Sequence, residues 1–335
     1  MSILSKVNFW NHQFSGLKSF IMMKQFSIIV VLALALGLST NTYGQQDPQY
    51  TQYMYNTQVV NPAYAGSRGS LDFAGLYRTQ WVGLDGAPKT GTFTFNTPIG
   101  AAENMGLGLS VVAEELGPAR ESNINVDYSY SIDVSETYKL AFGLKAGFDI
   151  LNVDFTKLNI YDPGDIFEFN IDNKIQPQIG AGVYYYSDKF YAGLSVPNFL
   201  NTKHFEESEV GPVSAQTIAA ERLHYFFITG YVFDLSENVK FKPAILTKMV
   251  SGSPLQADFS ANFMLYDKFV VGGSYRWSAA LSAMLGFQAS EGLFLGMGYD
   301  RETTDLAQFN DGSFEFFVRF EIFNKPDRVF TPRFF

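Results

Sequence analysis

The sequence predicts an all-β protein: a transmembrane, antiparallel outer-membrane β-barrel of about fourteen strands, with a short N-terminal periplasmic or plug segment. Three observations predict it: an export signal, two-residue hydrophobic alternation over residues 70–323, and connections of alternating length. The 335 residues include 29 glycines, 16% aromatic and 17% charged residues, a composition that excludes a disordered chain. The chain has no cysteine, which excludes disulfides and thiolate metal sites. Its net charge of −9 argues against a nucleic-acid partner.

The first 44 residues have the order of a secretory signal. A lysine precedes the short apolar run 27–38, and small and polar residues follow up to Gly44. This order predicts cleavage after Gly44. The run is too short to span a bilayer as a helix, which needs about 20 residues. We expect translation to start at Met22 or Met23, so that residues 1–21 (Met1 to Ile21) are an upstream extension.

Period-2 alternation repeats along the chain from residue 70 onward. In 123–134 the even positions are Ile, Val or Tyr, and the odd positions are Asn, Asp or Ser; 255–265 and 314–322 alternate similarly. A membrane barrel needs one apolar and one polar face on every strand, whereas a secreted soluble β-protein, the alternative, does not. The expected strands are 70–80, 90–99, 104–115, 121–134, 137–153, 174–187, 189–197, 221–235, 238–250, 254–266, 268–277, 279–289, 291–300 and 312–323.

The connections between these strands alternate in length. Every long one is odd-numbered: 81–89, 154–173, 198–220 and 301–311. Outer-membrane barrels have short periplasmic turns, long external loops and periplasmic termini. The pattern therefore predicts an outer-membrane location with both termini in the periplasm and the long loops outside the cell.

Two segments lie outside the barrel pattern. Residues 45–69 include Tyr50, Tyr53 and Thr57 at helical spacing, which predicts a short amphipathic helix. This segment is expected to fold into the lumen or lie beneath the barrel, as a plug, a partner-docking element or a strap across the floor. The tail 324–335 is expected in the periplasm, as an assembly signal or a contact with a periplasmic partner.

No pattern in the chain predicts a catalytic, metal or cofactor site. His204 and His224 match no catalytic arrangement, and the acidic loop 154–173 matches no calcium-binding spacing. Charged residues on the expected inner face could line a channel or pair across a closed interior. They are Lys139, Lys145, Asp149, Lys240, Lys242, Asp258, Arg276 and Arg319.

Four short motifs are unusually specific: 52–56 (QYMYN), 61–66 (NPAYAG), 77–83 (YRTQWVG) and 86–90 (GAPKT). Together they resemble the opening of the PorP/SprF family of type IX secretion outer-membrane proteins of Bacteroidota. The resemblance covers the whole mature chain and is strongest over residues 45–100. The motif positions that it singles out are Tyr53, Met54, Asn56, Asn61, Pro62, Tyr64, Gly66, Arg78, Gln80, Trp81, Gly83, Gly86 and Pro88.

The resemblance implies a non-enzymatic component of type IX secretion and, in some members, of gliding motility. The implied partners are outer-membrane lipid, periplasmic type IX components and a secreted surface protein, often an adhesin with a C-terminal sorting domain. A diffusion porin or a specific transporter is the alternative that the barrel pattern leaves open. No cofactor is implied.

The position of each motif suggests its structural part. Residues 61–66 are expected to shape the start of the first strand. Arg78 and Gln80 should share one face, Trp81 should begin the first external loop, and 86–88 should form a tight turn. The motifs can be folding signatures of the barrel and its plug or direct partner contacts, and the sequence leaves both open.

Overall fold

The structure, a computed structural model, describes residues 48–322 except 101, 158–169, 201–222 and 251–252. The predicted signal peptide with its cleavage after Gly44 and the tail 324–335 lie outside the described residues. So does most of the predicted loops 154–173 and 198–220. Apart from residues 253–254, the described residues belong to one compact unit, made of Gln45–Ser251 and Leu255–Phe335.

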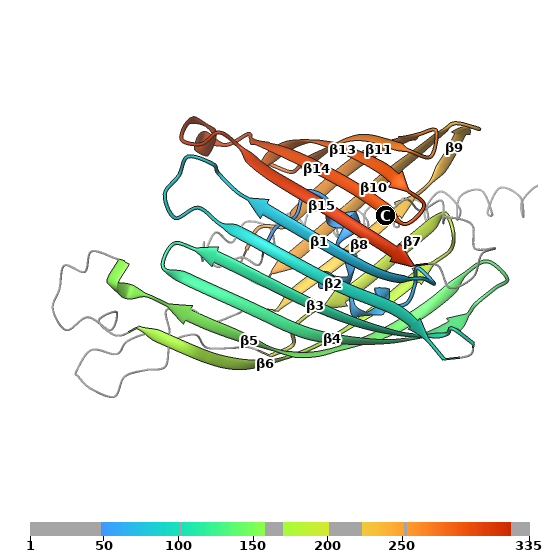
Figure 1. Cartoon of the computed structure of the whole chain (residues 1–335), viewed down its shortest axis with the longest axis horizontal. Coiled ribbons are helices and arrows are strands. Elements are labelled where there is room, and N and C mark those ends of the chain that lie inside the picture. Colours follow the sequence, from blue (N-terminus) through green and yellow to red (C-terminus); the bar gives the residue numbers. More distant parts are fainter. Residues whose placement is uncertain (1–47, 101, 158–169, 201–222, 251–252, 323–335) are drawn as a thin grey trace, which may run out of the picture. The chain divides into compact units, whose positions relative to one another are not determined.

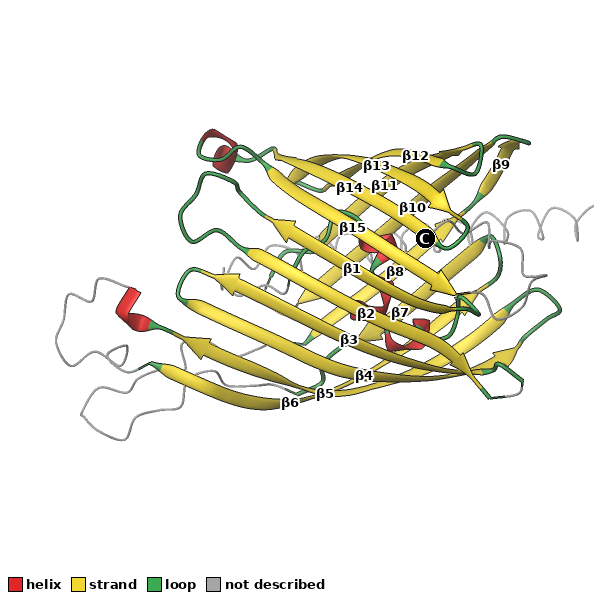
Figure 2. Cartoon of the chain, viewed as in Figure 1, coloured by secondary structure: helices red, strands yellow, loops and turns green. Residues whose placement is uncertain are grey.

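The described unit is a closed antiparallel β-barrel (Figures 1 and 2). Each strand pairs with the next along the chain, and the last strand pairs with the first, which closes the sheet. The strand segments are β1 Leu71–Thr79, β2 Lys89–Ile99, β3 Met105–Leu116, β4 Ala119–Asp133, β5 Lys139–Val153, β6 Ile171–Tyr186, β7 Phe190–Val196, β8 His224–Tyr231, β9 Phe233–Ser236, β10 Val239–Val250, β11 Gln256–Leu265, β12 Phe269–Arg276, β13 Ala280–Ser290, β14 Leu293–Glu302 and β15 Ser313–Ile322.

The fifteen segments make fourteen wall strands. Segments β8 and β9 continue the same register on β10, through Gly230↔Ala244 and then Phe233↔Phe241. The pairing is interrupted at residues 231–232, opposite Pro243 and Lys242, and Pro243 has no N–H to give to the ladder. The predicted fourteen-strand barrel is therefore confirmed, with strand ends within three residues of those expected.

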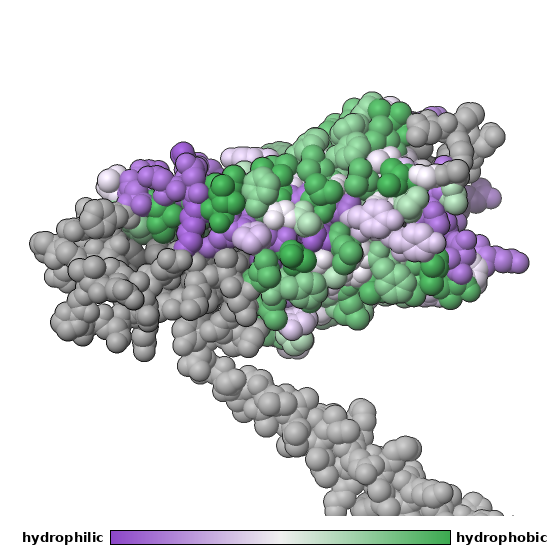
Figure 3. Space-filling model, turned by 90° about the horizontal axis from the view of Figure 1, so that it is seen from below, coloured by the Kyte–Doolittle hydropathy of each residue, from purple (hydrophilic) through white to green (hydrophobic). Residues whose placement is uncertain are grey.

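The two faces of the wall differ as the alternation predicts. On β4, Val126, Tyr128 and Tyr130 are 47%, 42% and 44% exposed, whereas Asp127 and Ser129 are 0% and 2% exposed. Figure 3 shows hydrophobic side chains gathered over the wall and hydrophilic ones mainly toward the two ends. Because lipid replaces water around a membrane barrel, the apolar side chains face outward and the polar ones line the lumen.

The connections form two rims of different character. The strand ends that carry the longest connections all lie at one rim, as the parity of the predicted loops indicated; the loops 80–88 and 303–312 mark this rim at the left of Figure 1. The long-loop rim comprises the connections 80–88, 117–118, 154–170, 197–223, 251–255, 277–279 and 303–312. The short-turn rim comprises 100–104, 134–138, 187–189, 237–238, 266–268 and 291–292.

Residues 48–70, called here the lumen segment, run through the barrel interior. They form three short turns, η1 Tyr53–Tyr55, α2 Thr57–Val60 and η2 Pro62–Tyr64. The expected single amphipathic helix is wrong, because residues 50–58 and 61–65 are buried all round. A proline disfavours the helical conformation of the residue before it. Asn61, which precedes Pro62, is accordingly extended (φ −137°, ψ 107°).

The other described helical turns, η3 Phe155–Lys157 and η5 Asp305–Gln308, lie in connections of the long-loop rim. No helix among the described residues has the length and hydrophobicity to cross a bilayer.

The lumen segment touches the wall so closely that some wall positions accept only glycine. A Cβ built on Gly143 of β5 would lie 2.1 Å from the Ala63 nitrogen. We expect Gly143→Ala to displace the segment and to destabilise the barrel by about 1–3 kcal/mol. Gly91→Ala is the matched control, because nothing lies within 4 Å of a Cβ there. The temperature at which the barrel unfolds in detergent, read from its heat-dependent gel mobility, should fall for Gly143→Ala alone.

Candidate functional site

The candidate site is the contact between the lumen segment and the polar inner face of the wall. Much of this segment is irregular, so its backbone groups need partners that a helix or sheet would otherwise supply. Side chains from strands around the barrel provide them. The contacts fall into four groups, which follow one another from the long-loop rim to the short-turn rim.

The first group, the Arg78 cluster, consists of Arg78, Asp300, Glu315, Thr51 and Gln52. Arg78 of β1 donates to Asp300 of β14 at 2.7 Å and pairs with Glu315 of β15 at 3.3 Å. All three side chains are at most 1% exposed. Glu315 also accepts the backbone N–H groups of Thr51 at 2.8 Å and Gln52 at 2.7 Å. A buried carboxylate is costly unless it is paired and hydrogen-bonded, so the lumen segment completes this cluster.

The second group joins the segment to β11 and β12. Arg276 of β12 pairs with Asp258 of β11 at 2.8 Å and donates to the carbonyl oxygen of Tyr50 at 3.3 Å. The Tyr53 hydroxyl bonds with the Ser260 hydroxyl at 2.9 Å. This guanidinium therefore serves the wall and the segment together.

The third group lies on the opposite part of the sheet, at β4 and β5. Lys145 lies 3.5 Å from Asp127 and donates to the carbonyl oxygen of Val59 at 2.8 Å. The Gln58 amide donates to Asp127 at 3.2 Å. Each buried charge again has one partner in the wall and a further partner in the segment.

The fourth group holds the end of the segment at the short-turn rim. Arg68 pairs with Glu321 of β15 at 2.6 Å. Ser129 donates to the carbonyl oxygen of Ala65 at 2.6 Å, and Asn96 accepts the N–H of Gly66 at 2.7 Å. The chain enters β1 directly from these contacts.

Aromatic packing fills the space between the polar groups. The Tyr55 ring stacks on Phe317 at a centroid distance of 5.1 Å and packs against Phe294 at 5.0 Å. Lys242, which is fully buried, lies 5.9 Å from the Tyr55 ring and 5.8 Å from the Tyr191 ring. A cation over aromatic faces is stabilised by their quadrupoles. These contacts leave the lumen occupied at the level of η1.

The structure brings together motif residues that are distant in sequence. The motif residues of the lumen segment line the site, and Gly66 is the last of them along the chain. Arg78 and Gln80, which were expected to share one face, are both buried. The buried motif residues of the segment are Tyr53, Met54, Asn56, Asn61, Pro62 and Tyr64.

The remaining motif residues build a loop at the long-loop rim. Trp81 begins the first loop, as expected, and its indole donates to Glu302 at 3.0 Å. Two backbone bonds, Val82 to Gly312 and Asp311 to Val82, both 2.8 Å, hold this loop to the connection 303–312. The turn that closes the loop has Gly86 at φ +74° and a bond from the Ala87 nitrogen to the Leu84 oxygen. Gly83 and Gly86 are exposed, and Pro88 is buried.

The predicted inner charges divide into two sets. Lys145, Asp149, Lys242, Asp258, Arg276 and Arg319 are buried in the lumen. Lys139 and Lys240 lie instead at the short-turn rim, where they pair with Asp133 and Asp267. Within the lumen, Lys145 forms an ion pair with Asp127, and Arg276 forms one with Asp258.

Sequence reasoning identified Asp258 but missed the other acidic members of these groups. The alternation that placed Arg319 inside also puts Glu315 and Glu321 on the same face of β15, so a signal for them was present. Asp72, Asp127 and Asp300 are further missed acidic residues, and all three are buried. Among the described residues, no group of His, Cys, Asp or Glu is arranged to hold a metal ion.

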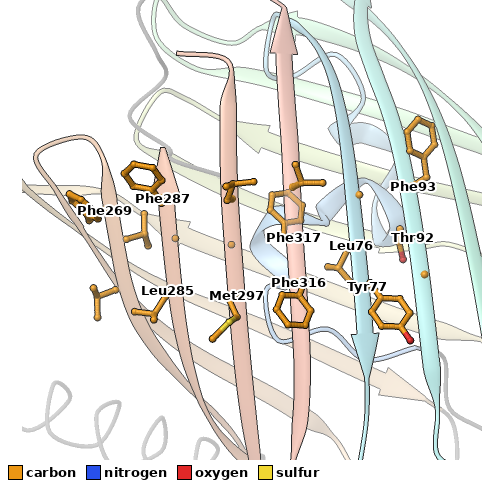
Figure 4. Close-up of a pocket in the computed structure, with 18 of the residues that line it drawn as sticks. Leu76, Tyr77, Thr92, Phe93, Phe269, Leu285, Phe287, Met297, Phe316 and Phe317 are labelled. Carbon is orange, nitrogen blue, oxygen red and sulfur yellow. The ribbon is translucent and has the colours of Figure 1, made fainter. Parts of the chain in front are cut away.

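The outward face carries a shallow apolar hollow of about 1040 Å³ across β12–β15 and β1–β3 (Figure 4). Its lining includes Tyr77, Phe93, Met297 and Phe316, with Gly75 and Gly91 between them. The hollow is part of the apolar belt that faces lipid.

The Arg78 cluster generates a test of the site. Arg78→Ala would leave Asp300 and Glu315 buried without their guanidinium, and we expect a loss of stability of about 3–5 kcal/mol. Arg120→Ala is the control, because Arg120 and Glu115 are 66% and 45% exposed and such pairs contribute less than about 1 kcal/mol. Urea unfolding of the detergent-solubilised barrel measures both. Equal small losses would contradict the structural importance of the cluster.

Residues 42–320 match the family model described as type IX secretion system membrane protein PorP/SprF. A search of curated proteins found no match. Among solved structures, the Acinetobacter baumannii outer membrane protein Omp33 has 9% identity and a TM-score of 0.43, over 76% of this chain and 100% of that one. The CymD monoaromatic hydrocarbon channel has 12% identity and a TM-score of 0.43, over 84% and 94%.

These structural likenesses are too distant to bear on function. The family match, in contrast, extends from the predicted signal cleavage region to the last strand. The closed barrel and this match together support an outer-membrane location and a part in secretion. The chain belongs to the PorP/SprF family of type IX secretion membrane proteins.

Proposed function

We propose that the protein is a non-enzymatic, non-conducting adaptor of the type IX secretion system. It retains an exported surface protein, such as an adhesin with a C-terminal sorting domain, at its long-loop rim. It contacts periplasmic parts of the secretion machine at its short-turn rim, including through the tail 324–335. A role in gliding motility would follow if the retained protein is a motility adhesin.

The observation that carries this proposal is the occupied lumen. A pore needs a continuous water-filled path lined by side chains that ions can approach. Here the charged groups of the lumen are bound to one another and to the lumen segment, as in the Arg78 cluster. A barrel filled in this way offers its rims, rather than its interior, to other molecules.

The two rims differ in a way that suits an adaptor. The long connections 154–170 and 197–223 join strands of a rigid wall, which is the usual arrangement of recognition loops. The bonded loops 80–88 and 303–312 add an ordered part to the same rim. By the general rule for outer-membrane barrels, the long-loop rim would face the cell exterior.

We expect the wild-type protein to be electrically silent in planar lipid bilayers, because the lumen segment occupies the pore. Single-channel recording of the purified full-length barrel tests this. A steady open conductance would favour the porin or transporter alternative and would overturn the non-conducting proposal. Heat-dependent gel mobility of the same sample confirms that the recorded protein is folded.

We expect the tagged wild-type protein to co-purify with a large exported surface protein from gently solubilised outer membranes. Replacing residues 201–220 by a short Gly-Ser linker should abolish that recovery and the surface display of the same protein, with barrel assembly unchanged. Mass spectrometry of the eluate and surface proteolysis of cells measure the two effects. Recovery of the barrel without any partner, or unchanged display after loop replacement, would contradict the adaptor role.

A further inference from the structure

The lumen segment begins at the long-loop rim. The Gln49 amide donates to Gln256 at 3.2 Å, and Gln256 is the first residue of β11 at that rim. Arg276, which binds the carbonyl oxygen of Tyr50, is the last residue of β12 at the same rim. The first described residues therefore lie level with the strand ends that carry the long connections.

The segment then descends through the barrel. Thr51 donates to Asp300, two residues before the end of β14. Tyr53 bonds with Ser260, which lies further along β11, and Val59 accepts from Lys145 in the middle of β5. Each successive contact is further from the long-loop rim.

The segment ends at the short-turn rim. Ala65 accepts from Ser129, which is four residues from the short-turn end of β4. Ser70 donates to Glu321, the residue before the end of β15. From there the chain turns into β1 and travels back to the long-loop rim (Figure 1).

We infer that the lumen segment threads the whole barrel, so that the start of the exported chain is displayed at the long-loop rim, whereas β15 ends at the short-turn rim. The expectation that both ends of the mature chain lie on the same side counted only strands. It omitted a segment that crosses the lumen before the first strand begins. With the long loops outside the cell, the mature N-terminus would lie on the cell surface.

Threading has a consequence for assembly. Near the long-loop rim the segment contacts β1, β2, β11, β12, β14 and β15, which belong to one continuous half of the wall. Deeper in the lumen it contacts β4 and β5 on the opposite half. The pairing of β1 with β15 closes the wall around the segment. The start of the chain joins the rim at which a retained surface protein is proposed to bind.

The absence of cysteine from the natural sequence makes single-cysteine labelling a direct test. One cysteine is inserted between Gln46 and Asp47. The reference variants are Thr304→Cys at the long-loop rim and Glu237→Cys at the short-turn rim, both at exposed positions. A membrane-impermeant maleimide is applied to intact cells and to cells with a permeabilised outer membrane.

We expect the N-terminal probe to react in the same preparation as Thr304→Cys. Reaction in the pattern of Glu237→Cys would overturn the inference. The result is independent of which rim faces outward: labelling of Thr304→Cys only after permeabilisation would refute the proposed orientation while leaving the threading intact. The threading inference and the adaptor proposal can thus fail separately.

A cross-linking measurement covers the case of an unreactive N-terminal probe. In the double variant Gln49→Cys/Gln256→Cys, oxidation with copper phenanthroline should form a disulfide between the two rim residues. The matched control is Gln49→Cys/Ser131→Cys, because Ser131 is an inward residue near the short-turn rim. A cross-link in the control pair, or none in the rim pair, would contradict the threaded path.

Discussion

The structure depends on one buried arginine at the seam where the barrel closes. Arg78 of β1 and Glu315 of β15 are register partners across that seam. Asp300, on the neighbouring strand β14, is the second carboxylate that pairs with Arg78. Two carboxylates face one guanidinium, so the wall by itself is not fully compensated. The backbone N–H groups of Thr51 and Gln52 supply the missing donors. The pairing of β1 with β15 and the position of the lumen segment therefore depend on the same buried charges.

The same arrangement recurs at the other end of the seam. Asp72 and Glu321 are register partners of β1 and β15, and Arg68 of the lumen segment lies close to both. The segment thus supplies partners to acidic side chains at both ends of the seam: backbone N–H groups at one end and the Arg68 guanidinium at the other. Buried ion pairs add little to net stability but strongly penalise any arrangement that separates them. In this barrel they specify a single path for the chain inside the wall.

A barrel whose lumen is occupied by its own N-terminal segment presents two chemically different rims and an apolar belt. Lipid covers the belt, short turns form one rim and long loops form the other. The family match assigns this barrel to type IX secretion, and the proposed adaptor role assigns its contacts with other proteins to the rims. The bonded loops 80–88 and 303–312 give the long-loop rim an ordered part.

The sequence predicted most of the wall because its signal is local. Alternation along a strand such as 123–134 reports which face each side chain takes, and the loop lengths report the two rims. The same alternation put Arg319 on the expected inner face, and the Arg319 side chain is buried in the structure. It did not distinguish Lys139 and Lys240, which share that face but lie at the rim, because alternation reports the face of a side chain and not its depth.

The path of the lumen segment was decided only by the tertiary structure. Helical spacing suggested one helix, but Pro62 and the wall contacts of Asn61 divide the segment into short turns. Nothing near Gln58 in the sequence points to Asp127 as its partner. Sequence by itself thus determined which faces are polar and how many strands close. Which buried charge meets which donor is a matter of long-range geometry, and that geometry set the course of the chain through the barrel.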